Sequence, residues 1–244
     1  MAEKDASKPV EPPKPVRIGG ESLLDRIRPY LKQIIIGIIV LSAVLVVVFT
    51  IRWLQERKQI AATEKLEQIL EVARERVRDK DEKPDPKAPS FASIKDRGAA
   101  VLDAIAKQGT DVAGAAFRGG QLLDAGKPDE AITEYRRGVA EKGIEGLLCR
   151  EGLGLALEAK AAAVKDPAAR QKGFEEALAA FEAMQPDENG PRRAYALYHQ
   201  ARIRQLLGKR AEAKSLFEKA KTAAKDDHDL TELIEKRLAA LGAA

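Results

Sequence analysis

The side chains that could do covalent or metal chemistry are few in this sequence. The 244 residues contain one Cys, Cys149, and two His, His199 and His228. One Cys cannot form a disulfide within the chain, and the two His lie too far apart to have the spacing of metal ligands. Cys149 follows two leucines in an apolar stretch with no His near it in sequence, so we interpret it as a packed thiol and not as a nucleophile. We expect no bound metal and no cofactor.

The motifs of phosphate and hydrolase chemistry do not occur either. The sequence has no G-x-x-x-x-G-K-[ST] loop, no G-x-S-x-G turn and no H-E-x-x-H pair. Gly119 and Gly120 are adjacent, but they lie inside a helical pattern, where close packing of two helices is the simpler explanation. We therefore predict no catalytic residues and no small-molecule substrate. An enzyme or enzyme-regulatory subunit is therefore the least supported of the three functions that we consider for this chain.

One segment has the length and composition of a membrane anchor. Residues 33–51 form an uncharged run of 19 residues, which as a helix spans about 29 Å, close to the hydrocarbon thickness of a bilayer. Lys32 and Arg52 flank it, and Tyr30 and Trp53 lie where interfacial aromatics are typical. A helix of a soluble domain would need polar residues on one face, and a cleavable signal peptide would have a shorter apolar run with a small-residue cleavage site. We predict an uncleaved single-pass anchor.

Charge predicts the orientation of this anchor. Residues 1–32 carry seven Lys and Arg, and a basic tail favours the cytoplasmic side. Residues 53–244 hold 34 Lys and Arg against 33 Asp and Glu, so the high isoelectric point does not indicate a nucleic-acid surface. We predict a cytoplasmic N-terminus and an extracytoplasmic C-terminal domain, which in a Gram-negative bacterium lies in the periplasm at the inner membrane.

Prolines and apolar periodicity divide the chain. The predicted parts are a disordered Pro-rich cytoplasmic tail (1–32), the transmembrane anchor (33–52), a stalk helix (53–79), a linker (80–90) and a helical repeat domain (91–244). The stalk has one apolar stripe, which indicates either packing on the following domain or a short dimeric coiled coil. The repeat domain begins with an Ala-rich helix over 91–108 that ends at Gly109, a C-cap residue.

A spaced pattern predicts that the chain is all-α, with a tetratricopeptide-repeat (TPR-like) α-solenoid after the anchor. Segments 126–138, 173–184 and 208–220 align with an Ala followed four residues later by an aromatic residue. Their spacings of 46 and 36 approach the 34-residue tetratricopeptide period if the turn of the middle unit carries an insertion. The predicted packing signature comprises Gly119, Gly126, Ala131, Tyr135, Ala177, Phe181, Ala201, Gly208, Ala213 and Phe217. Residues 229–242 read as a capping helix.

The tail, anchor, stalk and irregular repeat array resemble the YfgM-like family, which comprises ancillary subunits of the SecYEG translocon related to the tetratricopeptide domain of the cell-division coordinator CpoB. The resemblance is carried by the anchor and by residues 111–220, above all by VAGAAFRGGQLLDAGKPDEAITEYRRGV. It implies a membrane-anchored scaffold on the periplasmic side, with SecYEG and periplasmic chaperones as partners.

Tetratricopeptide arrays bind peptides on a concave surface lined by the first helix of each pair. The candidate groove residues in the third unit are Tyr195, Tyr198, Arg202 and Gln205. Two tyrosines one turn apart could anchor a peptide, or they could simply pack against neighbouring repeats. The Lys and Asn that grip carboxylates in chaperone-binding arrays are missing here, which weakens the second hypothesis, a cytoplasm-facing adaptor that recruits soluble proteins.

Overall fold

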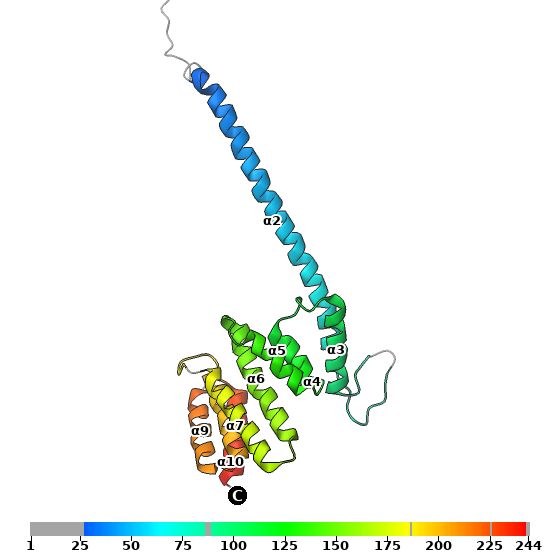
Figure 1. Cartoon of the computed structure of the whole chain (residues 1–244), viewed down its shortest axis with the longest axis vertical. Helices are drawn as coiled ribbons and strands as arrows, with labels where there is room; N and C mark the ends of the chain where they lie inside the picture. Colours follow the sequence, from blue (N-terminus) through cyan, green and yellow to red (C-terminus); the bar gives the residue numbers. More distant parts are fainter. Residues whose placement is uncertain (1–26, 86–88, 186, 225, 243–244) are drawn as a thin grey trace, which may run out of the picture. The chain divides into compact units, whose positions relative to one another are not determined.

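The structure, a computed structural model, describes residues 27–85, 89–185, 187–224 and 226–242. These residues form nine α-helices and one short 3-10 helix, and an isolated bridge joins Val77 and Phe91. The expected all-α class is therefore confirmed for this part of the chain. Two compact units, Met1–Gln59 and Ile60–Ala244, are described separately below (Figure 1). Of the predicted tail, residues 1–26 lie outside the described residues.

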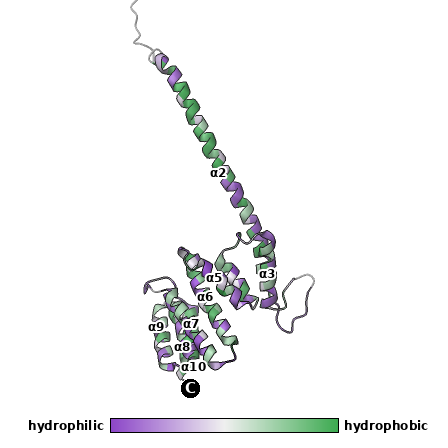
Figure 2. Cartoon of the chain, viewed as in Figure 1, coloured by the Kyte–Doolittle hydropathy of each residue, from purple (hydrophilic) through white to green (hydrophobic). Residues whose placement is uncertain are grey.

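The first unit contains one long apolar helix. The short helix η1 (Arg28–Tyr30) leads into α2 (Leu31–Arg74), which starts in this unit and ends in the second. No proline interrupts α2, so every backbone N–H is available to the helix. Figure 2 shows the uninterrupted hydrophobic stretch, which is long and apolar enough to cross a membrane and has no buried residue. The predicted apolar helix near the N-terminus is thus confirmed.

The end of α2 differs from the predicted stalk. The helix stops at Arg74, five residues before the expected boundary. The chain then pairs with a distant segment, because the Phe91 N–H donates to the Arg76 carbonyl at 2.9 Å and the Arg78 N–H donates to the Phe91 carbonyl at 3.0 Å. Because of this pairing, the next helix, α3 (Ile94–Gln108), begins three residues later than expected. The Ser93 hydroxyl caps its first turn. Residues 86–88 of the predicted linker lie outside the described residues.

The rest of the second unit consists of antiparallel helix pairs. They are α4 (Ala115–Asp124) with α5 (Pro128–Gly138), α6 (Gly143–Ala163) with α7 (Pro167–Met184), and α8 (Arg193–Leu206) with α9 (Arg210–Ala223), followed by α10 (His228–Gly242). Each helix from α3 onward packs on the next one, and α4 also packs on α6 (Figure 1). The packed pairs agree with the repeat pattern, and the tetratricopeptide assignment stays a prediction.

The first helix of the middle unit is long, as its sequence over 146–164 indicates, but the expected extension of the turn after it is wrong. The turn between α6 and α7 has only three residues, whereas the two helices have 21 and 18 residues. The turn is short because Asp166 caps α7, accepting the Ala169 N–H at 2.7 Å, and Pro167 follows at the first helical position.

The residues of the predicted packing signature form the seams between helices. Eight of them are buried, namely Gly119, Ala131, Tyr135, Ala177, Phe181, Ala201, Ala213 and Phe217. The other two, Gly126 and Gly208, occupy the turns within the first and third pairs at φ +75°, a backbone conformation that glycine adopts without strain. The small residues let helices approach closely, and the aromatic rings fill the space between pairs.

Candidate binding groove

An open pocket of about 430 Å³ lies among α4, α5, α6 and the residue before α8. Its polar lining consists of Tyr135, Glu145, Glu151 and Arg192. Its remaining lining consists of Ala116, Phe117, Leu148, Gly152 and Leu155. The pocket therefore combines apolar walls with a few charged groups, which is the usual make-up of a recognition site.

Two glycines allow Tyr135 to reach the floor of this pocket. The ring projects from α5 between α4 and α6, and a Cβ on Gly119 would lie only 2.6 Å from Tyr135 Cε1. A Cβ on Gly152 would overlap the same ring. Burial raises the pKa of Tyr135 to about 12, so its hydroxyl stays protonated at neutral pH. Among the described residues the hydroxyl has no hydrogen-bond partner, which leaves it available to a ligand.

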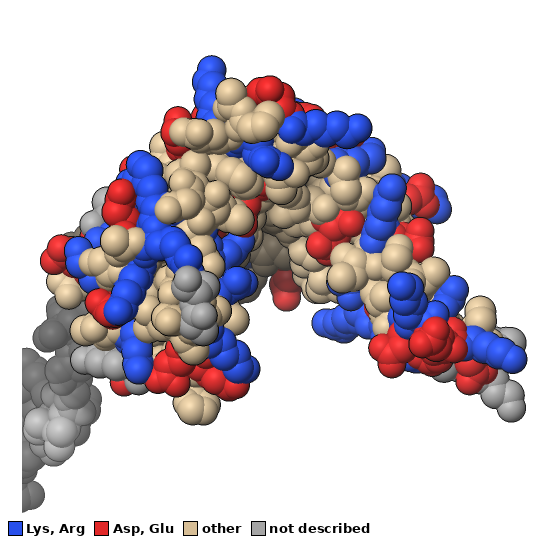
Figure 3. All heavy atoms as spheres, turned by 90° about the horizontal axis from the view of Figure 1, so that it is seen from below, with Lys and Arg blue, Asp and Glu red and all other residues tan. Residues whose placement is uncertain are grey.

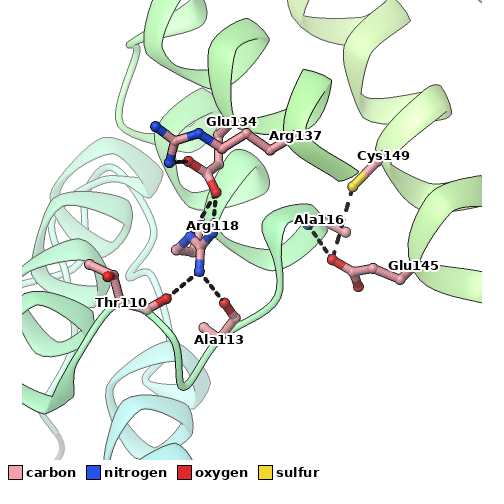
Figure 4. Close-up of polar contacts among 8 residues, drawn as sticks. All are labelled: Thr110, Ala113, Ala116, Arg118, Glu134, Arg137, Glu145 and Cys149. Carbon is pink, nitrogen blue, oxygen red and sulfur yellow. Dashed lines mark hydrogen bonds and ion pairs between the residues drawn. The ribbon is translucent and has the colours of Figure 1, made fainter. Parts of the chain in front are cut away.

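Glu145 fastens the start of α4 to α6. Its Oε1 accepts the Ala116 N–H at 2.9 Å (Figure 4), so the carboxylate lies at the positive end of the α4 dipole. A Cβ on Gly114 would lie 2.7 Å from this oxygen, so only glycine gives the carboxylate this access. No cationic side chain among the described residues pairs with Glu145, so no ion pair neutralises its negative charge at the pocket.

Cys149 lies behind Glu145 and is not reactive. The thiol is fully buried, and its Sγ is 4.0 Å from Glu145 Oε1. Burial, aided by the neighbouring Glu145 charge, raises the pKa of Cys149 to about 11. Since only the thiolate is a good nucleophile, this environment supports the interpretation of Cys149 as a packing residue.

On the far side of α4, Arg118 holds the preceding loop against α5. Its guanidinium donates to the carbonyls of Thr110 and Ala113 and pairs with Glu134 (Figure 4). Arg137 completes the network with a 3.0 Å bond to Glu134. These contacts satisfy the buried Glu134 carboxylate and fix the helix that supplies Phe117 to the pocket.

A buried polar array joins α6 to α8 beside the pocket. Glu151 is 8% exposed, pairs with Arg192 and lies 3.2 Å from His199 Nε2. Arg202 pairs with Glu158 and places Nη1 3.1 Å from His199 Nδ1. A guanidinium can only donate, so Nδ1 accepts and Nε2 carries the proton that is donated to Glu151.

The array leaves one oxygen of Glu151 unpaired. Its Oε2 is buried without a hydrogen-bond partner, and so is Nε of Arg192. Burial by itself raises the pKa of the Glu151 carboxyl, but the hydrogen bonds from His199 and Arg192 outweigh it and hold the pKa below its usual value. Glu151 is therefore ionised at neutral pH and keeps unused acceptor capacity.

The four predicted groove residues have different surroundings. Tyr198 is 6% exposed and packs against Phe217 with ring centroids 5.8 Å apart. Tyr195 is half-buried and donates to Asp227 Oδ2 at 2.8 Å. The burial of Tyr198 favours the packing alternative for this residue and argues against it as an exposed peptide anchor. Arg202 is engaged in the buried array described above, and Gln205 is half-buried on α8.

The predicted groove residues lie in the third pair and stay a prediction, whereas the pocket lies against the first and second pairs and is lined by Glu145, Glu151 and Arg192, which the sequence analysis did not single out. The missed signal was the stripe Glu145, Leu148, Gly152 and Leu155, spaced three and four apart along α6. It mixes a carboxylate with two exposed or half-exposed leucines, which a purely structural face would not need.

The charges around the hollow of the second unit have both signs. Seen from below in Figure 3, the surface is hollowed, and Lys and Arg are intermixed with Asp and Glu around the hollow. The wall of the hollow is mostly uncharged in this view.

Comparisons of the chain with protein-family models, with curated proteins and with solved structures find no match.

Proposed function

We propose that this chain is a membrane-anchored scaffold whose helical domain binds other proteins. The observation that carries the proposal is the apolar stretch of α2, which buries nothing in the structure although its side chains are large; Phe49, for example, is 68% exposed. An exposed apolar surface of this extent is unfavourable in water and is resolved by a bilayer or by a partner. The length and the flanking Lys32, Arg52 and Trp53 favour a bilayer.

The helical domain is a TPR-like α-solenoid in this proposal. Its support is the run of antiparallel pairs, the packing of α4 on α6 and the buried Ala-aromatic signature. Repeat domains of this kind offer a hollow lined by alternate helices, and the pocket against α4 and α6 lies on such helices. The ligand is a segment of another protein, because the pocket is open and lacks a group that would do chemistry on a small molecule.

The domain faces the periplasm at the bacterial inner membrane, near the Sec translocon, with SecYEG and periplasmic chaperones as partners. The support for this location is the basic N-terminal segment and the resemblance to YfgM-like proteins. Neither support depends on the groove, so location and binding can be tested separately.

Topology is the decisive experiment. Intact spheroplasts are treated with protease, and the surviving fragments are labelled at Cys149 after denaturation, because the native thiol is buried. We expect the domain to be digested from outside and residues 1–32 to remain attached to the anchor, as an intact-mass measurement would show. Protection of the domain until the membrane is broken would contradict the proposed side, and a mature chain that lacks the apolar run 33–51 would contradict the anchor. Crosslinking to Sec components then tests the partner.

A further inference from the structure

The charges that line the pocket do not cancel. Glu151 is paired with Arg192, whereas Glu145 accepts from two uncharged donors, the backbone N–H of Ala116 and the Cys149 thiol. A backbone amide carries no formal charge, so the described lining retains one excess negative charge. In a partly desolvated pocket, an uncompensated carboxylate favours a cationic ligand.

Two further groups point to a hydrogen-bond donor as the ligand. Glu151 lines the pocket, and its buried Oε2 has no partner, so a donor can reach this oxygen only if the neighbouring side chains shift. The Tyr135 hydroxyl at the floor is likewise unpartnered and can accept. Buried acceptors without donors are rare in proteins because each one costs free energy. A ligand that brings N–H groups would satisfy them.

The rim supplies the apolar part of the site. On α6, Leu148 is 38% exposed and Ile144, one turn earlier, is 65% exposed. Phe117 from α4 and Leu155 from α6 continue this surface into the pocket. A ligand that presents a cation next to aliphatic side chains would therefore match both parts.

We propose that this pocket binds a lysine or arginine side chain of a partner protein, with an apolar residue of the same segment packed on Leu148 and Phe117. Glu145 supplies the charge that selects the cation, and Glu151 and Tyr135 supply acceptors. The inference rests on the proposed function, since it names the chemistry of the segment that the scaffold recognises. It is the opposite of a carboxylate grip, in which a cationic pocket holds a chain terminus.

The test uses the full-length protein in nanodiscs and fluorescein-labelled decapeptides with both termini blocked. Three peptides of Ala and Ser share a central Leu-X-Leu, in which X is Lys, Gln or Glu, and binding is measured by fluorescence polarisation. We expect the Lys peptide to bind about tenfold more tightly than the Gln peptide, as one charge-assisted hydrogen bond would give, and the difference to shrink at high salt. Equal binding of the three, preference for Glu, or no binding would overturn the inference.

A matched pair of variants locates the effect. Glu145→Gln removes the charge and keeps an oxygen that can accept the Ala116 N–H, so we expect the fold to survive and the preference for Lys over Gln to disappear. Glu218→Gln makes the same change on the exposed face of α9 and should leave the preference intact. A preference that persists in Glu145→Gln would refute the assigned role. If the peptides fail while crosslinking to a protein partner succeeds, this inference falls and the scaffold proposal stands; if both fail, the scaffold proposal falls too.

Discussion

The first and third helix pairs share the same pattern of small and aromatic residues. The first pair nevertheless borders an open pocket, whereas in the third pair an aromatic ring fills the corresponding space. In the first pair, Tyr135 lies against Gly119, and Ala116 lines an open space of about 430 Å³. In the third pair the residue at the position of Ala116 is Tyr198, whose ring packs on the fully buried Phe217. The repeat pattern therefore sets the helix packing, while single positions on the first helix decide whether the surface is hollow or filled.

We expect removal of an aromatic ring to destabilise the chain more in the third helix pair than in the first. Phe217→Ala removes a fully buried side chain, and we expect the free energy of unfolding to fall by about 3–5 kcal/mol. Tyr135→Ala should cost less, because water can enter from the adjoining pocket and its hydroxyl already lacks a partner. Urea unfolding followed by circular dichroism measures both. Equal losses of unfolding free energy in the two variants would show that the first and third pairs do not differ in this way.

Neighbouring glycines of α4 provide a sharper version of the test. Gly119→Ala places a methyl group 2.6 Å from the Tyr135 ring, and we expect a destabilisation of about 1–3 kcal/mol. In Gly120→Ala the nearest atom is the Tyr135 hydroxyl oxygen at 3.7 Å, an ordinary contact. This variant should be neutral or more stable by up to about 1 kcal/mol, since alanine is the better helix former. Thermal melts of the two variants should therefore shift in opposite directions.

The polar array between the two seams should respond to acid. The pKa of Glu151 is lower in the folded chain than in the unfolded one, so its stabilising contribution is present above about pH 4.3. It should be lost as pH falls through the lower folded value. Glu151→Gln lacks this ionisation, and its urea midpoint between pH 6 and pH 3 should fall less steeply than that of the unaltered chain. Parallel curves would mean that other carboxylates dominate acid unfolding.

We expect the smallest effect on stability at Ala116, the position at which the first and third pairs differ. Ala116→Tyr gives the first pair the residue of the third pair at a half-buried position facing open space. We expect a change in unfolding free energy of about 0.5 kcal/mol or less, together with loss of binding of the Lys peptide. Retained binding in a folded Ala116→Tyr chain would show that the pocket is not the binding site.

Much of the fold could be predicted from the sequence, because helices, caps and packing positions depend on local and periodic signals. The apolar stretch of α2, the glycine turns at Gly126 and Gly208, and the Ala-aromatic seams all follow from residue type and spacing. The helix ends were harder, since the Arg74 boundary depends on pairing with Phe91, a contact between segments distant in sequence.

The pocket could not be located from the sequence for a similar reason. Tyr195 and Tyr198 have the composition of an anchor, but neighbouring helices cover Tyr198. Conversely, Glu145 and Glu151 read as ordinary helix-face carboxylates until the fold places them beside Ala116 and Arg192. Composition indicates which side chains could bind, whereas tertiary packing decides which of them a ligand can reach.

Because Cys149 is buried, the reactivity of the chain's only thiol would report local unfolding. Burial raises the pKa of the Cys149 thiol to about 11, and Gly138 of α5 leaves just enough room for its sulfur. Disulfide exchange and oxidation must therefore wait until α5 and α6 separate. In an oxidising compartment the folded protein would remain free of covalent dimers. With a thiol reagent in such excess that modification outpaces reclosing, the rate of Cys149 modification would equal the rate at which α5 and α6 separate.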